Sequence, residues 1–245
     1  MFDSVLILSI DTASLAGSVC LSRGGVVVAS AVGAPEVSHS NSLLRDINEC
    51  LEEAGVSLDD VDLFAAAAGP GSFTGLRIGL ATLKALAATL AKPCVGVPTL
   101  EALARAAGPS DATVALMPAG RGEVFAQMFS IASDDAITPL DEASHLSPQN
   151  LIAKYGSLKH LRWGGEGAHK NRNLLTETAT EKGIQFGELI WGEASQGWTL
   201  APEEKNLSKH VAALALRQFR RSQTIDARTL KAIYVRPSDA ELKCL

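Results

Sequence analysis

Asp11 is the first residue whose type and position could do chemistry. It ends the apolar run VLILSI and is followed by Thr12, Ala13 and Ser14. A carboxylate at a strand end, beside hydroxyl groups and turn amides, can hold a hydrated Mg²⁺ and the oxygens of a phosphate. The same residues also fit an ordinary turn, in which Asp11 and Ser14 bond the backbone. The sequence leaves both interpretations open.

Residues 69–80, GPGSFTGLRIGL, form a glycine-rich stretch that fits neither common nucleotide loop. A Walker loop has four residues between its glycines and then Lys and Ser/Thr, whereas five residues separate Gly69 from Gly75 and Leu76 follows. The dinucleotide fingerprint fails because Gly71 and Gly75 are one residue too far apart. The stretch therefore needs another explanation.

Two functions remain for this stretch. The amides of Gly71, Ser72 and Phe73 come just before a predicted helix, where exposed donors and the helix dipole favour an anion. Alternatively, Ser72 or Thr74 caps the helix and the glycines allow tight packing. Both functions can hold together.

Other catalytic and metal motifs are missing from the sequence. A metal pair with His39 would need a second His at position 35 or 43, where Pro35 and Leu43 stand. The sequence has no HExxH, GxSxG or CxxC motif, so we predict no catalytic residue and no metal site, and His39 is expected in a turn or an interface. The cysteines at positions 20, 50, 94 and 244 have no paired spacing, which favours reduced structural thiols in the cytoplasm.

Composition and charge limit the kinds of partner that the chain can bind. The 245 residues are 47% hydrophobic and carry a formal net charge of -5, which predicts a globular chain and argues against one that grips nucleic acid unaided. The N-terminus has an acid and no base before a short apolar run, so we expect a first strand there, and neither a signal peptide nor a membrane span. We expect weak binding of tRNA by the chain alone. The modest basic cluster outside the last helix comprises Arg162, His169, Lys170 and Arg172.

The elements that would position these residues follow from hydrophobic periodicity. Residues 5–10, 18–22 and 26–32 predict an antiparallel meander. An amphipathic helix over 39–54, a buried strand over 61–69, a helix ended by Pro93, a strand over 93–99 and a helix capped by Thr99 follow. The order of strands and helices predicts an α/β unit of about a hundred residues.

A second unit follows with the same opening pattern. Its predicted elements are strands over 113–117 and 122–130 around a turn at PAGR, a helix after Ser147 and Pro148 that ends at Gly156, a strand that ends in a glycine turn within 160–168, a long helix over 202–221 and a last strand over 231–237.

The first hundred residues resemble the TsaB (YeaZ) family, a subunit of the bacterial machinery that makes threonylcarbamoyladenosine next to the tRNA anticodon. The resemblance is carried by ILSIDTASLAGSVCLS, HSNSLL, LDDVDLFAAAAGPGSFTGLRIGLATLKALA and PCVGVPTLEALA. Farther on it is thinner, at GEVF and AIYVR. At MPAGRGEV the sequence departs from the family, because Pro118 and Gly120 replace an Asp and an Arg while Arg121 remains.

The resemblance implies an actin/sugar-kinase-like (ASKHA) α/β fold of two ribonuclease-H-like lobes, the second reduced. The first lobe would span 1–108, completed by a helix and strand at 203–236, and the second 109–202. Each lobe of that superfamily offers a phosphate-facing hairpin that often carries a carboxylate. Our pairing of the hairpins matches Asp11 with Pro118, so one of the two carboxylates is missing. The resemblance implies that the chain requires no cofactor, and it is compatible with weak binding of ATP or ADP together with Mg²⁺. The candidate nucleotide or phosphate residues are Asp11, Thr12, Ser14, Gly69, Gly71 and Ser72.

The family's role is that of a partner. The resemblance implies a non-catalytic dimerisation or scaffold subunit that forms homodimers, pairs with a TsaD-type catalytic subunit and joins a TsaE-type ATPase, meeting tRNA only through that complex and no membrane. Both N-terminal helices have more apolar and small surface than one core-facing stripe requires, although complete burial is the alternative. The candidate interface residues are His39, Leu43, Leu44, Ile47, Leu51, Leu76, Leu80 and Leu83.

Two other classes compete with this hypothesis. An ATP-dependent small-molecule kinase of the same superfamily would need the second acid and a sugar site. A glycoprotease-like peptidase would need a nucleophile or a metal pair, and the sequence motifs supply neither.

Overall fold

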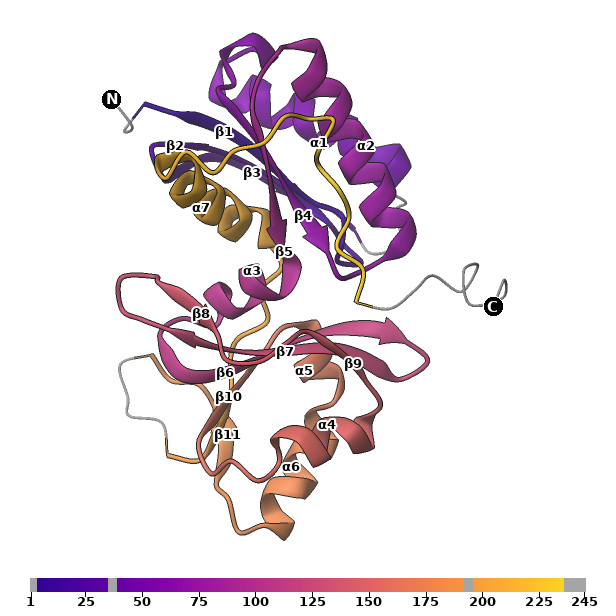
Figure 1. Cartoon of the computed structure of the whole chain (residues 1–245), viewed down its shortest axis with the longest axis vertical. Coiled ribbons are helices and arrows are strands. Elements are labelled where there is room, and N and C mark those ends of the chain that lie inside the picture. The colour runs from indigo at the N-terminus through magenta and orange to yellow at the C-terminus, as the bar shows by residue number, and fades with distance from the viewer. Residues whose placement is uncertain (1–3, 35–38, 192–195, 236–245) are drawn as a thin grey trace. The chain divides into compact units, whose positions relative to one another are not determined.

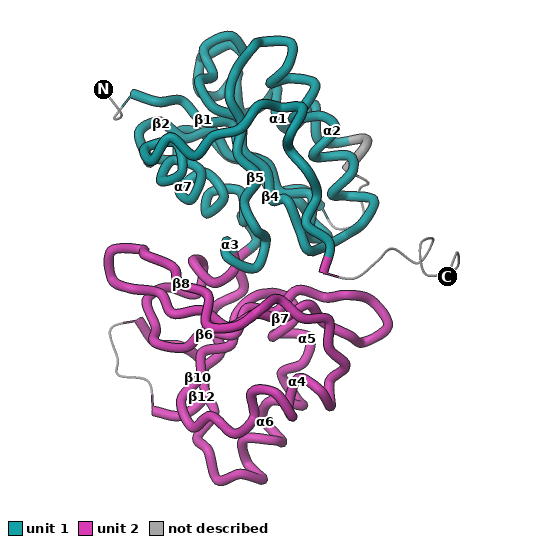
Figure 2. The backbone as a smooth tube through the Cα atoms, viewed as in Figure 1, with its two compact units in different colours: residues 1–102, 205–234 teal, residues 103–204, 235–245 magenta. Residues whose placement is uncertain are grey.

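A computed structural model describes residues 4–34, 39–191 and 196–235, with only the backbone described for 39–41. The chain divides into two compact units (Figure 2). Unit 1 comprises residues 1–102 and 205–234, and unit 2 comprises residues 103–204 and 235–245. Within the described residues, no helix is long and apolar enough to cross a bilayer.

Unit 1 is a five-stranded sheet with the order β3-β2-β1-β4-β5 and helices on both faces (Figure 1). The first three strands are antiparallel, while β4 is parallel to β1 and β5 is parallel to β4. The predicted meander and the first α/β unit are thereby confirmed. The elements are β1 (Leu6–Asp11), β2 (Ser18–Arg23), β3 (Val26–Val32), α1 (His39–Ala54), η1 (Leu58–Asp60), β4 (Leu63–Gly69), α2 (Phe73–Thr89), β5 (Cys94–Pro98), α3 (Thr99–Ala106), which runs into unit 2, and α7 (Leu207–Arg220).

Strand β1 separates two packing layers because its side chains alternate between the sheet faces. Leu6, Leu8 and Ile10 share a core with buried residues of α1 and α2. On the opposite face Ser9 donates a hydrogen bond of 2.9 Å to the Ser208 carbonyl of α7. The alternation therefore places α1 and α2 on one side of the sheet and α7 on the other.

Three buried serines attach α7 to strands that lie about 190 residues earlier in the chain. The Ser208 backbone N–H donates to Ser18 Oγ at 3.0 Å, and Ser9 Oγ is within 3.1 Å of the Cys20 carbonyl. Asn206 caps the helix by accepting from the Lys209 backbone N–H. Because buried polar groups destabilise a fold unless they are bonded, these bonds set where the helix begins against the sheet.

Helix α2 approaches the turn between β1 and β2 very closely. Ser72 caps the helix by accepting from the Gly75 backbone N–H at 3.2 Å. A Cβ at Gly71 would lie 2.7 Å from Ala13, and one at Gly79 would overlap Thr12 Oγ1. The glycine-rich stretch therefore allows tight packing, and its hydroxyl caps the helix.

Unit 2 is a second sheet with the order β11-β12-β10-β6-β7-β8, in which β9 pairs with β7. Its core is built around Tyr155, Trp163 and Trp198, and the two indole rings meet edge-on at 5.1 Å. Helix α4 begins after Ser147, with Pro148 at its first position, and ends before Gly156, as predicted. The elements are β6 (Ser110–Gly120), β7 (Glu123–Ile131), β8 (Ile137–Pro139), β9 (Ser144–Leu146), α4 (Pro148–Tyr155), β10 (Leu161–Gly164), α5 (Glu166–Lys170), α6 (Arg172–Glu181), β11 (Phe186–Glu188) and β12 (Trp198–Leu200).

The turn predicted at PAGR lies later than expected. Strand β6 continues through Pro118, which is opposite Val124, and the chain turns at Arg121 and Gly122. Both turn residues have positive φ, 51° and 79°, as a two-residue hairpin turn requires. Glycine at position 122 meets that requirement without strain, so the turn forms there.

The last predicted strand, over 231–237, is wrong for its described part. Residues 231–235 form no strand, and residues 236–237 lie outside the described residues. Ile233 donates one backbone hydrogen bond of 2.7 Å to the Ala68 carbonyl of β4. Strand β4 is already paired with β1 and β5, so it has no free edge for a further strand.

Most of the predicted interface row belongs to the core. Leu44 is 65% exposed, whereas Leu51 is 5% exposed and packs against the sheet. Helices α1 and α2 use these apolar side chains to cover β2, β3 and β4, which matches the burial alternative for every described member of the row except Leu44. The side chain of His39 lies outside the described residues. The buried members are Leu43, Ile47, Leu51, Leu76, Leu80 and Leu83.

We expect Leu51→Glu and Leu44→Glu to behave oppositely in thermal unfolding. Leu51→Glu places an unpaired carboxylate in the core and should lower the free energy of unfolding by about 3 kcal/mol or more. Leu44→Glu should stay within about 0.5 kcal/mol of the parent chain because the position is exposed. Equal melting temperatures for the two variants would contradict the burial of Leu51.

We also expect Gly79→Ala to destabilise the chain by about 1–3 kcal/mol, because the new methyl group overlaps Thr12. Thr12→Ala in the same chain should recover part of the loss, which denaturant unfolding of the double-mutant cycle measures. Gly187→Ala is the control, since a Cβ there meets no atom within 4 Å. Additive effects at positions 12 and 79 would refute this contact.

Candidate functional site

The Asp11 carboxylate is fully buried and is bonded by its own turn. Its Oδ1 accepts from the backbone N–H groups of Ala13 at 2.8 Å and Ser14 at 3.3 Å. Its Oδ2 accepts from the Ser14 hydroxyl, which in turn accepts from the Gly17 backbone N–H at 3.3 Å. These contacts match the turn interpretation of the sequence, in which the carboxylate organises the backbone.

The structure brings the glycine-rich stretch to this turn. The Ser72 backbone N–H donates to the Ala13 carbonyl at 2.9 Å, and Thr12 is buried against Gly79. Five of the six predicted phosphate residues therefore surround one junction: Asp11, Thr12, Ser14, Gly71 and Ser72. The Ser72 amide that we expected to face an anion has a protein acceptor instead.

Gly69, the sixth predicted residue, has other neighbours. Its backbone N–H donates to Thr99 Oγ1 at 3.1 Å, and a Cβ at this position would overlap the Ile233 carbonyl. The sequence marked Thr99 only as a helix cap and Ile233 only as part of a strand. Nothing in their types signalled the contact, because residues 30 and 164 positions apart meet only in the folded chain.

The second hairpin differs from the first at the matching position. Asp11 is opposite Ser18 at the end of the first hairpin, and Pro118 is opposite Val124 near the end of the second. Proline has no side-chain oxygen, so it cannot replace a carboxylate. Glu123, the carboxylate at the start of β7, lies 2.9 Å from His145 Nε2.

The predicted basic cluster of unit 2 is already bonded within the protein. Burial lowers the pKa of Arg162, whose Nη1 is held by backbone carbonyls instead of carboxylates. Backbone carbonyls thus hold Arg162 and His169, whereas the ion pairs of Lys170 and Arg172 are exposed and weak. The contacts are Arg162 with the carbonyls of Ala107, Gly108 and Pro109, His169 with the Ala201 carbonyl, Lys170 with Glu166, and Arg172 with Glu188.

Three of the cysteines are free thiols in the core of unit 1. Burial raises the pKa of Cys20 and Cys94 to about 11 and that of Cys50 to about 12, so the thiols stay protonated at neutral pH. Cys244 lies outside the described residues. Within the described ranges, no group of three His, Cys, Asp or Glu side chains is placed to hold a metal ion.

Sequence comparison finds relatives in one tRNA-modification system. The family model described as "TsaD: tRNA N6-adenosine threonylcarbamoyltransferase" matches residues 22–182. The tRNA threonylcarbamoyladenosine biosynthesis protein TsaB of Escherichia coli K12 is 38% identical over 49% of this chain and 52% of its own length. The Bacillus subtilis protein of the same name is 31% identical over 50% of this chain and 54% of its own length. The chain thus spans about half the length of these curated relatives that it matches.

The fold is that of solved YeaZ structures. YeaZ from Pseudomonas aeruginosa superposes with a TM-score of 0.72 over 94% of this chain and 99% of its own, at 24% identity. A second structure, described as an uncharacterized protein with similarity to peptidase YeaZ, superposes with a TM-score of 0.73. The match covers 95% of this chain and 100% of its own, at 22% identity. These matches and the two sheets confirm the predicted α/β fold with one sheet in each of two units. Since the family model matches more than half of the sequence, the chain belongs to the tRNA N6-adenosine threonylcarbamoyltransferase (TsaD) family, and it is similar to proteins named TsaB.

Proposed function

We propose that the chain is a non-catalytic subunit that supports a TsaD-type partner in transferring threonylcarbamoyl to the adenosine next to the tRNA anticodon. The names of its TsaB relatives support the pathway. The state of Asp11 carries the non-catalytic part of the proposal, because that carboxylate is buried and bonded within its own turn.

The chemical argument rests on what group transfer from an adenylate or from ATP demands. Such reactions need phosphate held by a metal ion or by donors and facing a positioned nucleophile. Asp11 would have to leave Ala13 and Ser14 before it could bind a hydrated Mg²⁺, and Pro118 offers no second carboxylate. Weak ATP or ADP binding would then use other groups and lead to no turnover. The same argument disfavours the kinase alternative.

The proposed partners are a second copy of this chain, a TsaD-type subunit and a TsaE-type ATPase in the cytoplasm, with tRNA reached through the complex. The match to the TsaD family model supports pairing between chains of related fold. Among the candidate interface residues whose side chains are described, Leu44 is the exposed one. It is therefore our candidate for a contact with a partner. Its neighbours in the row position it by anchoring α1 to the sheet.

We expect the purified chain to hydrolyse Mg·ATP no faster than a buffer control. Asp11→Asn should leave that background unchanged, yet lower the melting temperature because an amide is a poorer acceptor for Ala13 and Ser14. A coupled ADP-release assay and thermal melting measure the two effects. Steady hydrolysis that Asp11→Asn abolishes would overturn the non-catalytic proposal.

We expect Leu44→Glu to weaken association while the fold is kept. A carboxylate in a desolvated interface should lower the affinity for a partner at least about thirtyfold, which is typical of an interface hot spot. Light scattering of the pure chain and co-purification with a TsaD homologue from the same source measure association. Leu158→Glu, at an exposed leucine of unit 2, is the control. If both variants associate like the parent chain, Leu44 is no contact.

A further inference from the structure

The segment after α7 runs antiparallel along α2 (Figure 1). Near the start of the helix, the rings of Phe73 and Tyr234 lie 5.8 Å apart. At its middle, Lys84 Nζ donates to the Leu230 carbonyl at 3.1 Å. At its end, a groove of about 410 Å³ lies between residues 87–93 and 224–228. Contacts along the whole helix therefore make α2 and residues 224–235 one continuous face, here called the α2 face.

The α2 face is basic in an acidic chain. Residues 73–93 and 224–235 contain five Lys or Arg residues and a single acid, Asp226, a net charge of +4 in a chain of net charge -5. Helix α1, on the other side of α2, is acidic, with four carboxylates and one arginine. The charges are thus segregated, which gives this face a positive field. The basic residues are Arg77, Lys84, Lys92, Arg228 and Lys231.

These cations are largely available to a ligand. Among the described residues, no carboxylate lies within ion-pair distance of Arg77 or Lys231. Arg228 is 3.7 Å from Asp226, but both side chains are mostly exposed, so this pair is weak. Lys84 bonds a neutral carbonyl and no carboxylate of the described residues.

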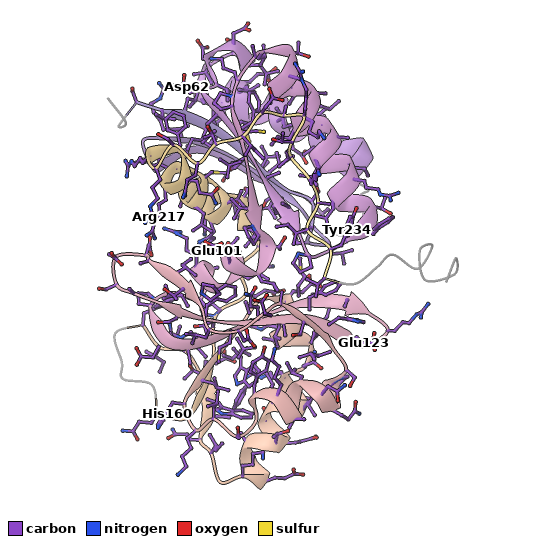
Figure 3. The ribbon with its side chains drawn as sticks, viewed as in Figure 1. Asp62, Glu101, Glu123, His160, Arg217 and Tyr234 are labelled. Atoms are coloured by element: carbon purple, nitrogen blue, oxygen red, sulfur yellow. The ribbon has the colours of Figure 1, made fainter. Side chains whose placement is uncertain are left out.

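Two exposed aromatic rings lie at one end of this face. Phe73 is 36% exposed and Tyr234 is 49% exposed, and Figure 3 shows Tyr234 on the segment beside α2. The Arg77 guanidinium lies 3.8 Å over the Phe73 ring. Ring faces beside cations are what proteins use to stack the bases of single-stranded nucleic acid while the cations meet its phosphates.

We propose that the α2 face binds single-stranded RNA, with a base stacked at Tyr234 and the phosphates along the basic side chains. This rests on the proposed function and changes it in one respect: the chain itself contacts tRNA, at a surface other than the basic cluster of residues 162–172. An acidic peptide would also meet the cations, but single-stranded RNA offers both phosphates for the cations and flat bases for the exposed ring faces. The stacking contribution therefore favours RNA.

Fluorescence anisotropy of the pure full chain with a labelled single-stranded RNA of about a dozen nucleotides, at low salt, tests the proposal. We expect a dissociation constant of about 1–100 µM. Arg228→Glu with Lys231→Glu should weaken binding at least about tenfold and reduce the salt slope by about 1.4, since each contacted phosphate contributes about 0.7. Tyr234→Ala should weaken it about fivefold, and Tyr234→Phe, which keeps the ring, should not.

The control is Lys159→Glu with Lys182→Glu, which changes the net charge equally at two exposed lysines of unit 2. It should weaken binding clearly less than the variant on the α2 face. The proposal fails if the two double variants weaken binding alike, if RNA does not bind at low salt, or if Tyr234→Ala has no effect and polyglutamate competes as well as RNA. Since no partner is present, this failure is distinct from a failure of Leu44→Glu to disturb association.

Discussion

The buried carboxylate of Asp11 is the constraint on which unit 1 depends. It ends an apolar strand at zero exposure, where an unpaired charge would be strongly destabilising. The turn therefore folds around it, and the amides and hydroxyl that satisfy it fix the positions of Thr12 and Ala13. Ala13 packs against Gly71, just before α2, and Thr12 packs against Gly79 of α2. The same bonds that build the junction occupy the carboxylate that phosphate chemistry would need.

Unit 1 is completed by a part of the chain that lies far away in sequence. Helix α7 is held to the first hairpin by Ser9, Ser18 and Ser208, and residues 224–235 then run along α2. This arrangement covers the sheet with α7 and also sets a basic segment beside a helix that has no acids of its own. A structural requirement, covering the second face of the sheet, thus produces a charged surface suited to recognition.

The proposed scaffold role and the proposed contact with RNA are compatible on this fold because they would use different surfaces. Leu44 belongs to the acidic helix α1, whereas the cations and rings gather along α2 and the segment beside it. Segregated charge orients an acidic chain toward a polyanion that its net charge would repel. The modest affinity that we expect from the chain alone would suit the proposed subunit, since its catalytic partner would supply the remaining contacts.

The sequence by itself determined the opening meander, helices α1, α2, α4 and α7, and the family, because periodicity, capping residues and local motifs depend on neighbouring residues. Tertiary structure alone decided which leucines of one helical row are core and that Leu44 is exposed, since burial depends on what covers each face. It also replaced a last strand with a segment beside α2, because β4 was already paired on both edges. The saturation of Asp11 and the basic α2 face likewise arise from residues brought together by folding, and spacing along the chain carries no record of such contacts.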